Sequence, residues 1–229
     1  MRLSRVLLIE HGADAPEPDR VRRFPARKGR RTELLRPFAG DALPATREGL
    51  EGVAIHGGAQ QIPETDRDPY LRGEHALAAA AAARGVPILG ICPGAQCLAH
   101  ARGARVAACD GMHEFGCCTV TPTEAGRGFL PGPMPMPQSH FHGSDLPPMA
   151  ERLAMSPVCP HQAFRPGSAV GIQFHPEVTP GIMRHWQRLG SAPRGDPGAE
   201  LRPEPHRFTA VHDGAIDTWC NGFLAGWAA

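Results

Sequence analysis

Short apolar runs alternate with segments of helical composition along the first half of the chain. Residues 5–10 (RVLLIE), 52–55 (GVAI) and 87–91 (PILGI) are apolar runs of strand length with polar or turn residues at their ends. Runs that are apolar throughout are typical of strands buried on both faces, as in a parallel sheet. Residues 66–84 predict a helix, because acidic residues lie in its first half, an alanine run follows and Gly85 stands at its end.

Weaker patterns complete this first half. Residues 94–101 predict a helix, residues 32–37 a weak strand and residues 105–108 another strand. Residues 15–31 hold three prolines and a basic cluster, which fits either a short helix or a loop. Strand and helix therefore alternate up to about residue 109, which predicts a parallel sheet with helices on its faces.

The second half of the chain has a different hydrophobic pattern, in which short strand-like runs are separated by turn residues. These runs cover residues 116–121, 136–142, 152–156, 162–165 and 169–174, and they predict a small antiparallel or mixed addition. Residues 179–189 and 207–227 predict closing helices, joined by a surface connector over residues 190–205. The predicted fold class is α/β, with a mostly parallel, flavodoxin-like sheet flanked by helices and a small antiparallel addition.

Composition and charge exclude several classes of protein. The chain has 229 residues, of which 41% are hydrophobic, and 24 Lys plus Arg against 23 Asp plus Glu leave a net charge of +1. The longest basic run, RKGRR at residues 27–31, is too small a footprint for a dedicated nucleic-acid binder. The apolar runs are much shorter than the roughly 20 residues that cross a membrane, and too short for a signal peptide. We expect a cytoplasmic protein with neither a nucleic-acid nor a membrane partner.

The cysteines and histidines show no recognisable framework. Seven cysteines are an odd number, and no Cys-x-x-Cys pair occurs among them, so a disulfide scaffold is not expected. Most of these thiols are best interpreted as small buried apolar groups. His140 and His142 alternate along a predicted strand, and His113 precedes Cys117 and Cys118 by four or five residues. Because no set of four ligands has a known zinc spacing, we predict neither a metal nor a cofactor.

One cysteine has a context that indicates chemistry. Gly90, Cys92 and Gly94 form the pattern Gly-x-Cys-x-Gly between a predicted strand and a predicted helix, as a nucleophile elbow requires. A sharp turn of this kind lifts the side chain clear of the sheet, and the helix N-terminus favours the thiolate. The simpler interpretation, a buried cysteine beside a tight turn, is the default for an isolated cysteine.

Partners for this thiol are found at the end of the last predicted strand. In an extended segment residues two apart point the same way, so His175 and Glu177 share a face. Pro176 biases His175 toward the extended conformation. A carboxylate can then orient the imidazole, which deprotonates the thiol. Cys92, His175 and Glu177 together predict a catalytic triad.

These two segments resemble the two signatures of class I, or triad, glutamine amidotransferases. The matching stretches are PILGICPGAQ (residues 87–96) and QFHPE (residues 173–177). The resemblance continues at residues 53–58, a strand ending in a glycine pair, at HEFG (residues 113–116) and at residues 159–165. It covers about residues 5–189 and is closest to stand-alone proteins similar to the amidotransferase domain of GMP synthase. We therefore expect one domain over residues 1–229, with its core at 5–189 and a C-terminal helix over 206–229.

The resemblance implies hydrolysis of the side-chain amide of glutamine to glutamate and ammonia through a glutamyl thioester. In the family Cys92 corresponds to the nucleophile, His175 to the base and later acid, and Glu177 to the residue that orients it. Gly58 corresponds to the glycine whose N–H contributes to the oxyanion hole. The expected substrate-binding residues are Gly57, Gln96 and His142, although the sequence around His142 is two residues shorter than usual.

The residue after the nucleophile departs from the family pattern. Pro93 stands where the family usually has Leu or another residue whose N–H donates to the oxyanion, and proline has no such donor. Loss of one donor costs on the order of a hundred- to a thousandfold in turnover. The fold can accept Pro93, because proline suits the first turn of a helix. We expect an active but weakened enzyme, with Gly94 as a substitute donor.

Two other functions remain open at this stage. The same triad would serve a hydrolase of γ-glutamyl amides or peptides, and the missing donor would suit a binding or regulatory homologue that has lost efficient catalysis. No Gly-x-x-x-x-Gly-Lys-[Ser/Thr] signature for ATP occurs. The amidotransferase hypothesis therefore expects ammonia to pass to a separate synthetase. The oligomeric state is not predicted.

Overall fold

A single large sheet forms the centre of the computed structural model, which describes residues 5–12, 15–44, 49–108, 113–189 and 205–227. Over these residues the sheet has nine strands in the order β2-β1-β3-β4-β11-β10-β9-β6-β7. Its parallel half consists of β1 (Arg5–His11), β2 (Arg31–Leu35), β3 (Leu50–Gly58), β4 (Ile88–Ile91) and β11 (Ala169–Ile172). Its antiparallel half consists of β6 (Glu114–Pro122), β7 (Met134–His140), β9 (Glu151–Met155) and β10 (Ala163–Arg165).

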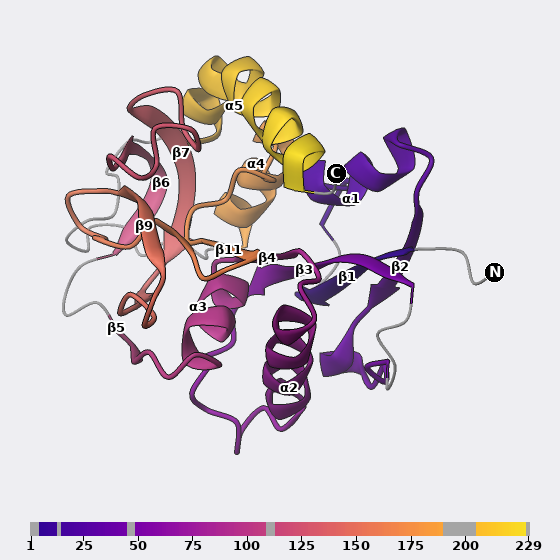
Figure 1. The fold of residues 1–229 in the computed structure, drawn as a ribbon. Coiled ribbons are helices and arrows are strands. Elements are labelled where there is room, and N and C mark those ends of the chain that lie inside the picture. Colours follow the sequence, from indigo (N-terminus) through magenta and orange to yellow (C-terminus); the bar gives the residue numbers. More distant parts are fainter. Residues whose placement is uncertain (1–4, 13–14, 45–48, 109–112, 190–204, 228–229) are drawn as a thin grey trace.

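Helices cover both faces of the sheet (Figure 1). On the lower face in that view lie α2 (Tyr70–Ala83) and α3 (Pro93–His100). On the upper face lie α1 (Arg20–Arg27), α4 (Pro180–Arg188) and the long α5 (Pro205–Trp227). A short 3-10 helix, η1 (Pro37–Ala39), follows β2. The predicted α/β fold with a parallel, helix-flanked sheet and an antiparallel addition is confirmed.

The core has one layer on each face of the sheet. Val6 and Leu8 of β1 point into the layer shared with α1 and α5, while Leu7 and Ile9 point into the layer shared with α2 and α3. All four side chains are at most 3% exposed. Because successive side chains of a strand face opposite sides, a strand buried on both faces must be apolar throughout. This explains the continuous apolar run from which the strand was predicted.

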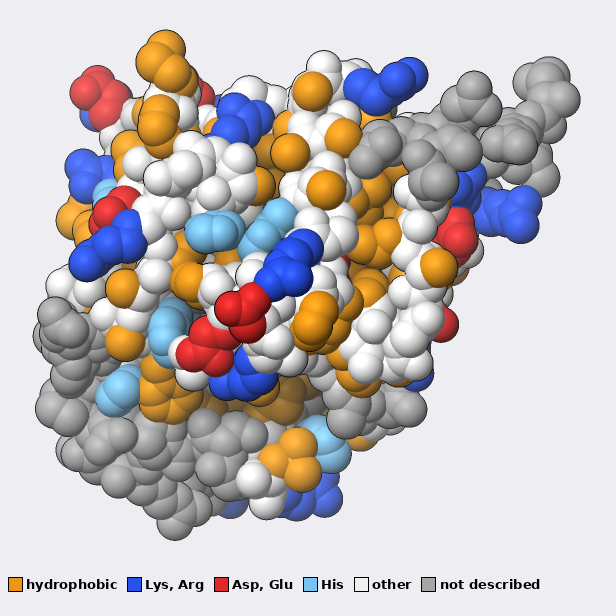
Figure 2. Space-filling view, turned by 90° about the horizontal axis from the view of Figure 1, so that it is seen from below, with side chains coloured by type: hydrophobic (Ala, Val, Ile, Leu, Met, Phe, Trp, Pro, Cys, Tyr) orange, Lys and Arg blue, Asp and Glu red, His pale blue; other side chains and the backbone are white. Residues whose placement is uncertain are grey.

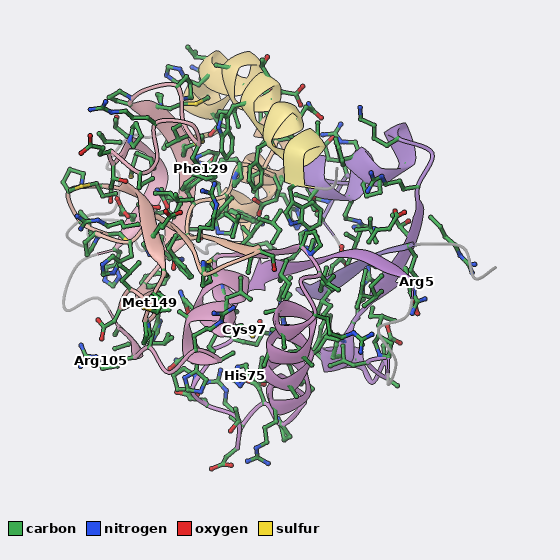
Figure 3. The ribbon with its side chains drawn as sticks, viewed as in Figure 1. Arg5, His75, Cys97, Arg105, Phe129 and Met149 are labelled. Carbon is green, nitrogen blue, oxygen red and sulfur yellow. The ribbon has the colours of Figure 1, made fainter. Side chains whose placement is uncertain are left out.

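A ring contact and a hydrogen bond between Trp219 and Phe129 hold α5 against the antiparallel half. Phe129, labelled in Figure 3, lies under α5 and meets the Trp219 ring edge-on at 5.3 Å. The Trp219 indole N–H also donates to the Phe129 carbonyl over 2.6 Å. Trp227 is buried in the same core layer. Trp219 and Trp227 therefore both pack against the core layer on this face of the sheet.

Several predicted element boundaries were wrong. The helix expected over residues 66–84 begins at Tyr70, since Pro69 stands at its N-cap and a proline disfavours the helical conformation for the residue before it. The strand expected over residues 32–37 ends at Leu35, because Pro37 begins η1. The last strand stops at Ile172 instead of residue 174. The connector predicted over residues 190–205 and the cysteine at position 109 lie outside the described residues, apart from Pro205, which begins α5.

The strand predicted at residues 105–108 does not join the parallel sheet. As β5 (Val106–Ala108) it pairs antiparallel with β8 (His142–Ser144) in a separate two-stranded sheet. The single strand expected over residues 136–142 is accordingly divided: β7 pairs with β6 up to His140, and after Phe141 the chain pairs with β5 instead. After this change of partner, β8 lies against α3.

None of the described helices is long and apolar enough to cross a membrane. On the face shown in Figure 2, basic and acidic side chains are intermixed, and that face carries no continuous basic surface.

Candidate active site

Cys92 stands at the turn between β4 and α3. Its backbone φ is 53° and its ψ is −112°, a conformation that residues other than glycine rarely adopt. A Cβ atom on Gly90 would lie 2.4 Å from the Gly94 carbonyl oxygen, and one on Gly94 would lie 2.1 Å from the Ile55 carbonyl oxygen. Only glycine fits at either position. The sharp strand-to-helix turn predicted at Cys92 is therefore present, and it is built by close backbone packing of α3 against β3 and β4.

His175 and Glu177 follow β11, the strand next to β4 in the sheet. The His175 Nδ1–H donates to Glu177 Oε1 over 2.7 Å, and both side chains are buried. The His175 backbone N–H donates to the Pro137 carbonyl over 2.8 Å, which fixes the residue against β7. The two residues thus meet as their spacing predicted.

The sheet brings this pair to Cys92. A Cβ atom on Gly57 would lie 2.9 Å from His175 Cε1 and 3.4 Å from the Cys92 Cβ, so Gly57 touches both side chains. The Cys92 Sγ lies 3.8 Å from the Ser139 carbonyl oxygen. The His175 Nε2 is buried and has no hydrogen-bond partner among the described residues. It is the ring nitrogen left for the thiol.

The charges around His175 favour its protonated form. Burial by itself would lower the pKa of His175, but the Glu177 carboxylate and the Cys92 side chain outweigh it and raise that pKa to about 10. An imidazolium beside Cys92 stabilises a thiolate, which is the nucleophilic form of cysteine.

A cavity of about 710 Å³ opens above these residues. Its walls come from the ends of β1 and β3, the start of α3, the segment after β7, and α4. Among the residues predicted for the site, those that line it are Gly57, Gly58, Cys92, Pro93, Gln96, His142, His175 and Glu177. Gly94 is not part of this lining and packs beneath the turn against Ile55.

Gln96 and His142 are joined to each other. The Gln96 amide donates to the His142 carbonyl over 3.0 Å and to Gln173 Oε1 over 3.1 Å. Gln96 is only 2% exposed, so this amide holds the segment around His142 from below. Partial burial lowers the pKa of His142 against an opposing effect of Glu64, which favours a neutral imidazole at the rim of the cavity.

Two groups at the cavity escaped the sequence analysis. His56 Nε2 lies 3.5 Å from Asp19 Oδ2, and both side chains are largely buried. Burial would lower the pKa of His56, yet Asp19 raises it to about 9, so a second buried cation faces the cavity. The Trp186 ring stands edge-on to His175 with the centroids 5.0 Å apart. Only the position of His56 before the glycine pair could have indicated its place.

A buried hydrogen-bond network supports the His140 side of the cavity. Ligand atoms of Glu114, His140 and Cys159 lie within 4.8 Å of one another. The Glu114 carboxylate, however, already accepts hydrogen bonds from Gln162 over 2.6 Å and Ser156 over 2.7 Å, and lies 3.0 Å from His140 Nε2. The residues 113–116 and 159–165 singled out in the sequence therefore meet here through Glu114 and Gln162. The bonds explain the cluster without a metal ion.

Known proteins share both the sequence pattern and the architecture. A family model described as glutamine amidotransferase class-I matches residues 41–186. The glutamine amidotransferase-like protein YfeJ of Salmonella typhimurium is 34% identical over 173 residues, which cover 67% of this chain and 69% of that protein. The glutamine-hydrolyzing GMP synthase of Thermomicrobium roseum is 36% identical over 134 residues, which cover 56% of this chain and 23% of the synthase.

Two solved structures superpose on nearly the whole chain. A glutamine amidotransferase from Thermotoga maritima has a TM-score of 0.85 and 25% identity and covers 100% of this chain and 99% of its own. A glutamine amidotransferase from Methylobacillus flagellatus has a TM-score of 0.88 and 26% identity over 98% of this chain and 94% of its own. With the family model matching well over half of the residues, this chain belongs to the class I glutamine amidotransferase family.

Proposed function

We propose that this protein hydrolyses the side-chain amide of glutamine to glutamate and ammonia, with Cys92 as nucleophile, His175 as general base and acid, and Glu177 as the residue that orients His175. The observation that carries the proposal is the meeting of a strained, cavity-facing Cys92 with a histidine whose Nδ1 is held by Glu177 at 2.7 Å. Membership of the amidotransferase family supports glutamine as the substrate.

The first half of the reaction forms an acyl-enzyme. His175 Nε2 takes the proton of the Cys92 thiol, and the thiolate attacks the Cδ carbon of the glutamine side chain. The tetrahedral intermediate collapses as the imidazolium returns this proton to the amide nitrogen. Ammonia leaves, and a γ-glutamyl thioester remains on Cys92.

The second half regenerates the enzyme. His175 Nε2 accepts a proton from a water molecule, whose oxygen attacks the thioester carbonyl. The C–S bond then breaks, the proton passes to the Cys92 sulfur, and glutamate leaves. Glu177 stabilises the imidazolium that forms in each half of the reaction.

The oxyanion of each tetrahedral intermediate requires hydrogen-bond donors. We assign one donor to the backbone N–H of Gly58, which lines the cavity close to the triad. Pro93 cannot be the second because it has no N–H. We propose the N–H of Gly94 in that role, acting from beneath the turn because Gly94 is not part of the cavity lining. Gly57, Gln96 and His142 are proposed to bind the substrate, His142 near its amino-acid end.

Ammonia release from purified protein tests this function. We expect glutamine to yield glutamate and ammonia in equal amounts, and Cys92→Ala to abolish the release. A glutamine-analogue electrophile should label wild type at one site per chain and should not label Cys92→Ala. Preferred hydrolysis of γ-glutamyl amines over glutamine would replace the proposed substrate, and failure of both turnover and labelling would leave a binding protein.

A synthetase on a separate protein is the proposed acceptor of the ammonia. The relatives named GMP synthase are much longer than the matched segment, which covers 23% to 34% of their length in the examples from Thermomicrobium roseum and Bordetella avium. Faster glutamine hydrolysis on addition of a candidate synthetase with its own substrates would support such a partner.

A further inference from the structure

Arg20, at the start of α1, is a buried arginine with an unusual set of partners. It is 3% exposed. Its Nη1–H groups donate to the carbonyl of Pro176 over 3.1 Å and to that of Val178 over 2.6 Å, and its backbone N–H donates to the carbonyl of Glu177 over 3.1 Å. Arg20 therefore binds three consecutive carbonyls around the triad carboxylate.

The same guanidinium is held from the other side by α5. Its Nε–H donates to Asp217 Oδ1 over 2.9 Å, and its Nη2–H donates to Asp213 Oδ1. Asp213 and Asp217 are four residues apart and thus lie on one face of the helix. Their side chains are 37% and 44% exposed, whereas the Arg20 side chain is 2% exposed. Burying an unpaired charge costs desolvation free energy. Pairing with these two carboxylates offsets that cost for the Arg20 guanidinium.

Glu177 depends on this support because its side chain has few bonds of its own. Its Oε1 accepts from His175, but its Oε2 is buried without a hydrogen-bond partner among the described residues. One hydrogen bond, from His175, therefore orients this buried carboxylate. The backbone position of residues 176–178 must then set where Oε1 meets His175.

We propose that Arg20 is a positioning residue for the triad, and that Asp213 and Asp217 of α5 form with Arg20 a clamp that holds residues 176–178 in place. The reaction that this clamp serves rests on the proposed function. Arg20 and both aspartates lie outside residues 41–186, the segment matched by the family model. The clamp is therefore a feature of this chain beyond the matched segment.

The double variant Asp213→Ala/Asp217→Ala tests the proposal without placing a change in the cavity. We expect kcat for glutamine to fall about ten- to a hundredfold, since small misplacements of reacting groups carry penalties of this order. KM should stay within about twofold, because the cavity walls are unchanged. Asp66→Ala/Glu124→Ala is the matched control: it removes two carboxylates that pair with the surface arginines Arg72 and Arg127 and should leave kcat unchanged.

A second measurement separates positioning from loss of folding and from failure of the proposed function. The alkylation rate of Cys92 by iodoacetamide at neutral pH, followed by mass spectrometry of its peptide, reports the thiolate without any turnover. We expect a fall of about tenfold or more in Asp213→Ala/Asp217→Ala. The variant Asp213→Asn/Asp217→Asn keeps hydrogen-bond acceptors. Its alkylation rate should lie between those of the double alanine variant and wild type. Circular dichroism should show all variants folded at the assay temperature.

The outcomes are distinguishable. A wild type that releases no ammonia refutes glutamine hydrolysis, but the alkylation rates still decide the role of the clamp. Equal alkylation rates in the double alanine variant and the control overturn the clamp, whatever happens to kcat. A rise in KM with unchanged kcat also overturns it, because that result would mean that α5 acts on substrate binding instead.

Discussion

At the scale of single residues, the proposed chemistry depends on a backbone conformation of Cys92 that residues other than glycine rarely adopt. A positive φ on a residue with a Cβ costs on the order of 1–3 kcal/mol and persists only where the surroundings enforce it. Here the enforcement comes from Gly90 and Gly94, whose missing side chains let three backbone segments meet. In return the thiol faces the cavity beside His175.

Pro93 is the residue most open to a direct test. Pro93→Leu would restore a backbone N–H after the proposed nucleophile, at the first position of α3. We expect kcat for glutamine to rise by up to about a hundredfold, the lower end of what one oxyanion donor contributes. Ammonia release measures this directly. An unchanged kcat would mean that the missing donor does not limit turnover.

His56 predicts a pH-dependent stability. Its pKa is about 9 in the folded protein against an ordinary value of 6.5, because Asp19 outweighs the effect of burial. The contribution of protonated His56 to the stability of the folded protein is therefore complete below pH 6.5 and is lost as the pH rises through 9. A pKa shift of this size contributes at most about 3 kcal/mol to the free energy of unfolding.

Urea unfolding of wild type and His56→Gln at pH 6 and pH 10 measures the pH-dependent stability that His56 contributes. We expect the advantage of wild type over the variant to shrink by about 2–3 kcal/mol between the two pH values. His175 titrates in the same window, but it is present in both proteins and cancels in the difference. A difference that stays constant with pH would show that His56 gains nothing from Asp19.

At the scale of elements, the site lies where parallel strands end. The carboxyl ends of β1, β3, β4 and β11 meet at one edge of the sheet, which is the usual place for sites in open α/β sheets. β3 supplies Gly57 and Gly58, β4 leads into Cys92, and β11 leads toward His175. Residues far apart in the chain thus become neighbours through strand order.

The packing of α3 against β3 can be tested with glycine substitutions. Gly94→Ala places a methyl group 2.1 Å from the Ile55 carbonyl oxygen. We expect it to lower the free energy of unfolding by about 1–3 kcal/mol or more, as overpacking does, and to lower kcat by displacing Cys92. Unfolding curves and ammonia release measure the two effects.

Gly222→Ala is the matched control for this substitution. Gly222 is also a helical glycine, but a Cβ atom there would meet nothing within 4 Å. Alanine is favoured over glycine in a helix by about 0.5–1 kcal/mol, so this variant should be as stable as wild type or more so. Similar losses from both substitutions would refute the close approach at Gly94.

At the scale of the whole molecule, α5 closes one of the two core layers. Three side chains of α5 are at most 1% exposed: Ile216, Cys220 and Leu224. They pack in the core layer that also holds side chains of β1 and β11 and Phe174. Arg20 links the same helix to the segment that carries the proposed triad residue Glu177. The last helix thus contributes both to the core and to the site, although the family model ends before it.

Leu224→Ala measures the contribution of α5 to the core. Removing a fully buried leucine side chain should lower the free energy of unfolding by about 2–5 kcal/mol. Val211→Ala is the comparison on the same helix: Val211 is 77% exposed, and its change should stay within about 0.5 kcal/mol. Equal effects in urea unfolding would mean that α5 is not packed as described.

Much of the site could be predicted because its signals are local. The spacing Gly90-x-Cys92-x-Gly94 encodes the elbow, and the spacing of His175 and Glu177 encodes their hydrogen bond. The partner change at Phe141 could not be predicted, since the residues from Met136 to His142 carry one strand pattern for two different sheets. The His56 and Asp19 pair, the Trp186 contact and the Arg20 clamp also lack a sequence spacing, because each joins distant segments.

The sequence by itself determined the α/β class, the family and the residues of the predicted triad. These depend on strand periodicity and on short motifs, which act over a few residues. Only the tertiary structure decided which charged groups surround the triad and which helix supports it. Pairing of Arg20 with Asp213 and Asp217 spans almost 200 positions of the chain. Such contacts arise when layers pack, since burial then forces each charge to find a partner wherever the fold supplies one.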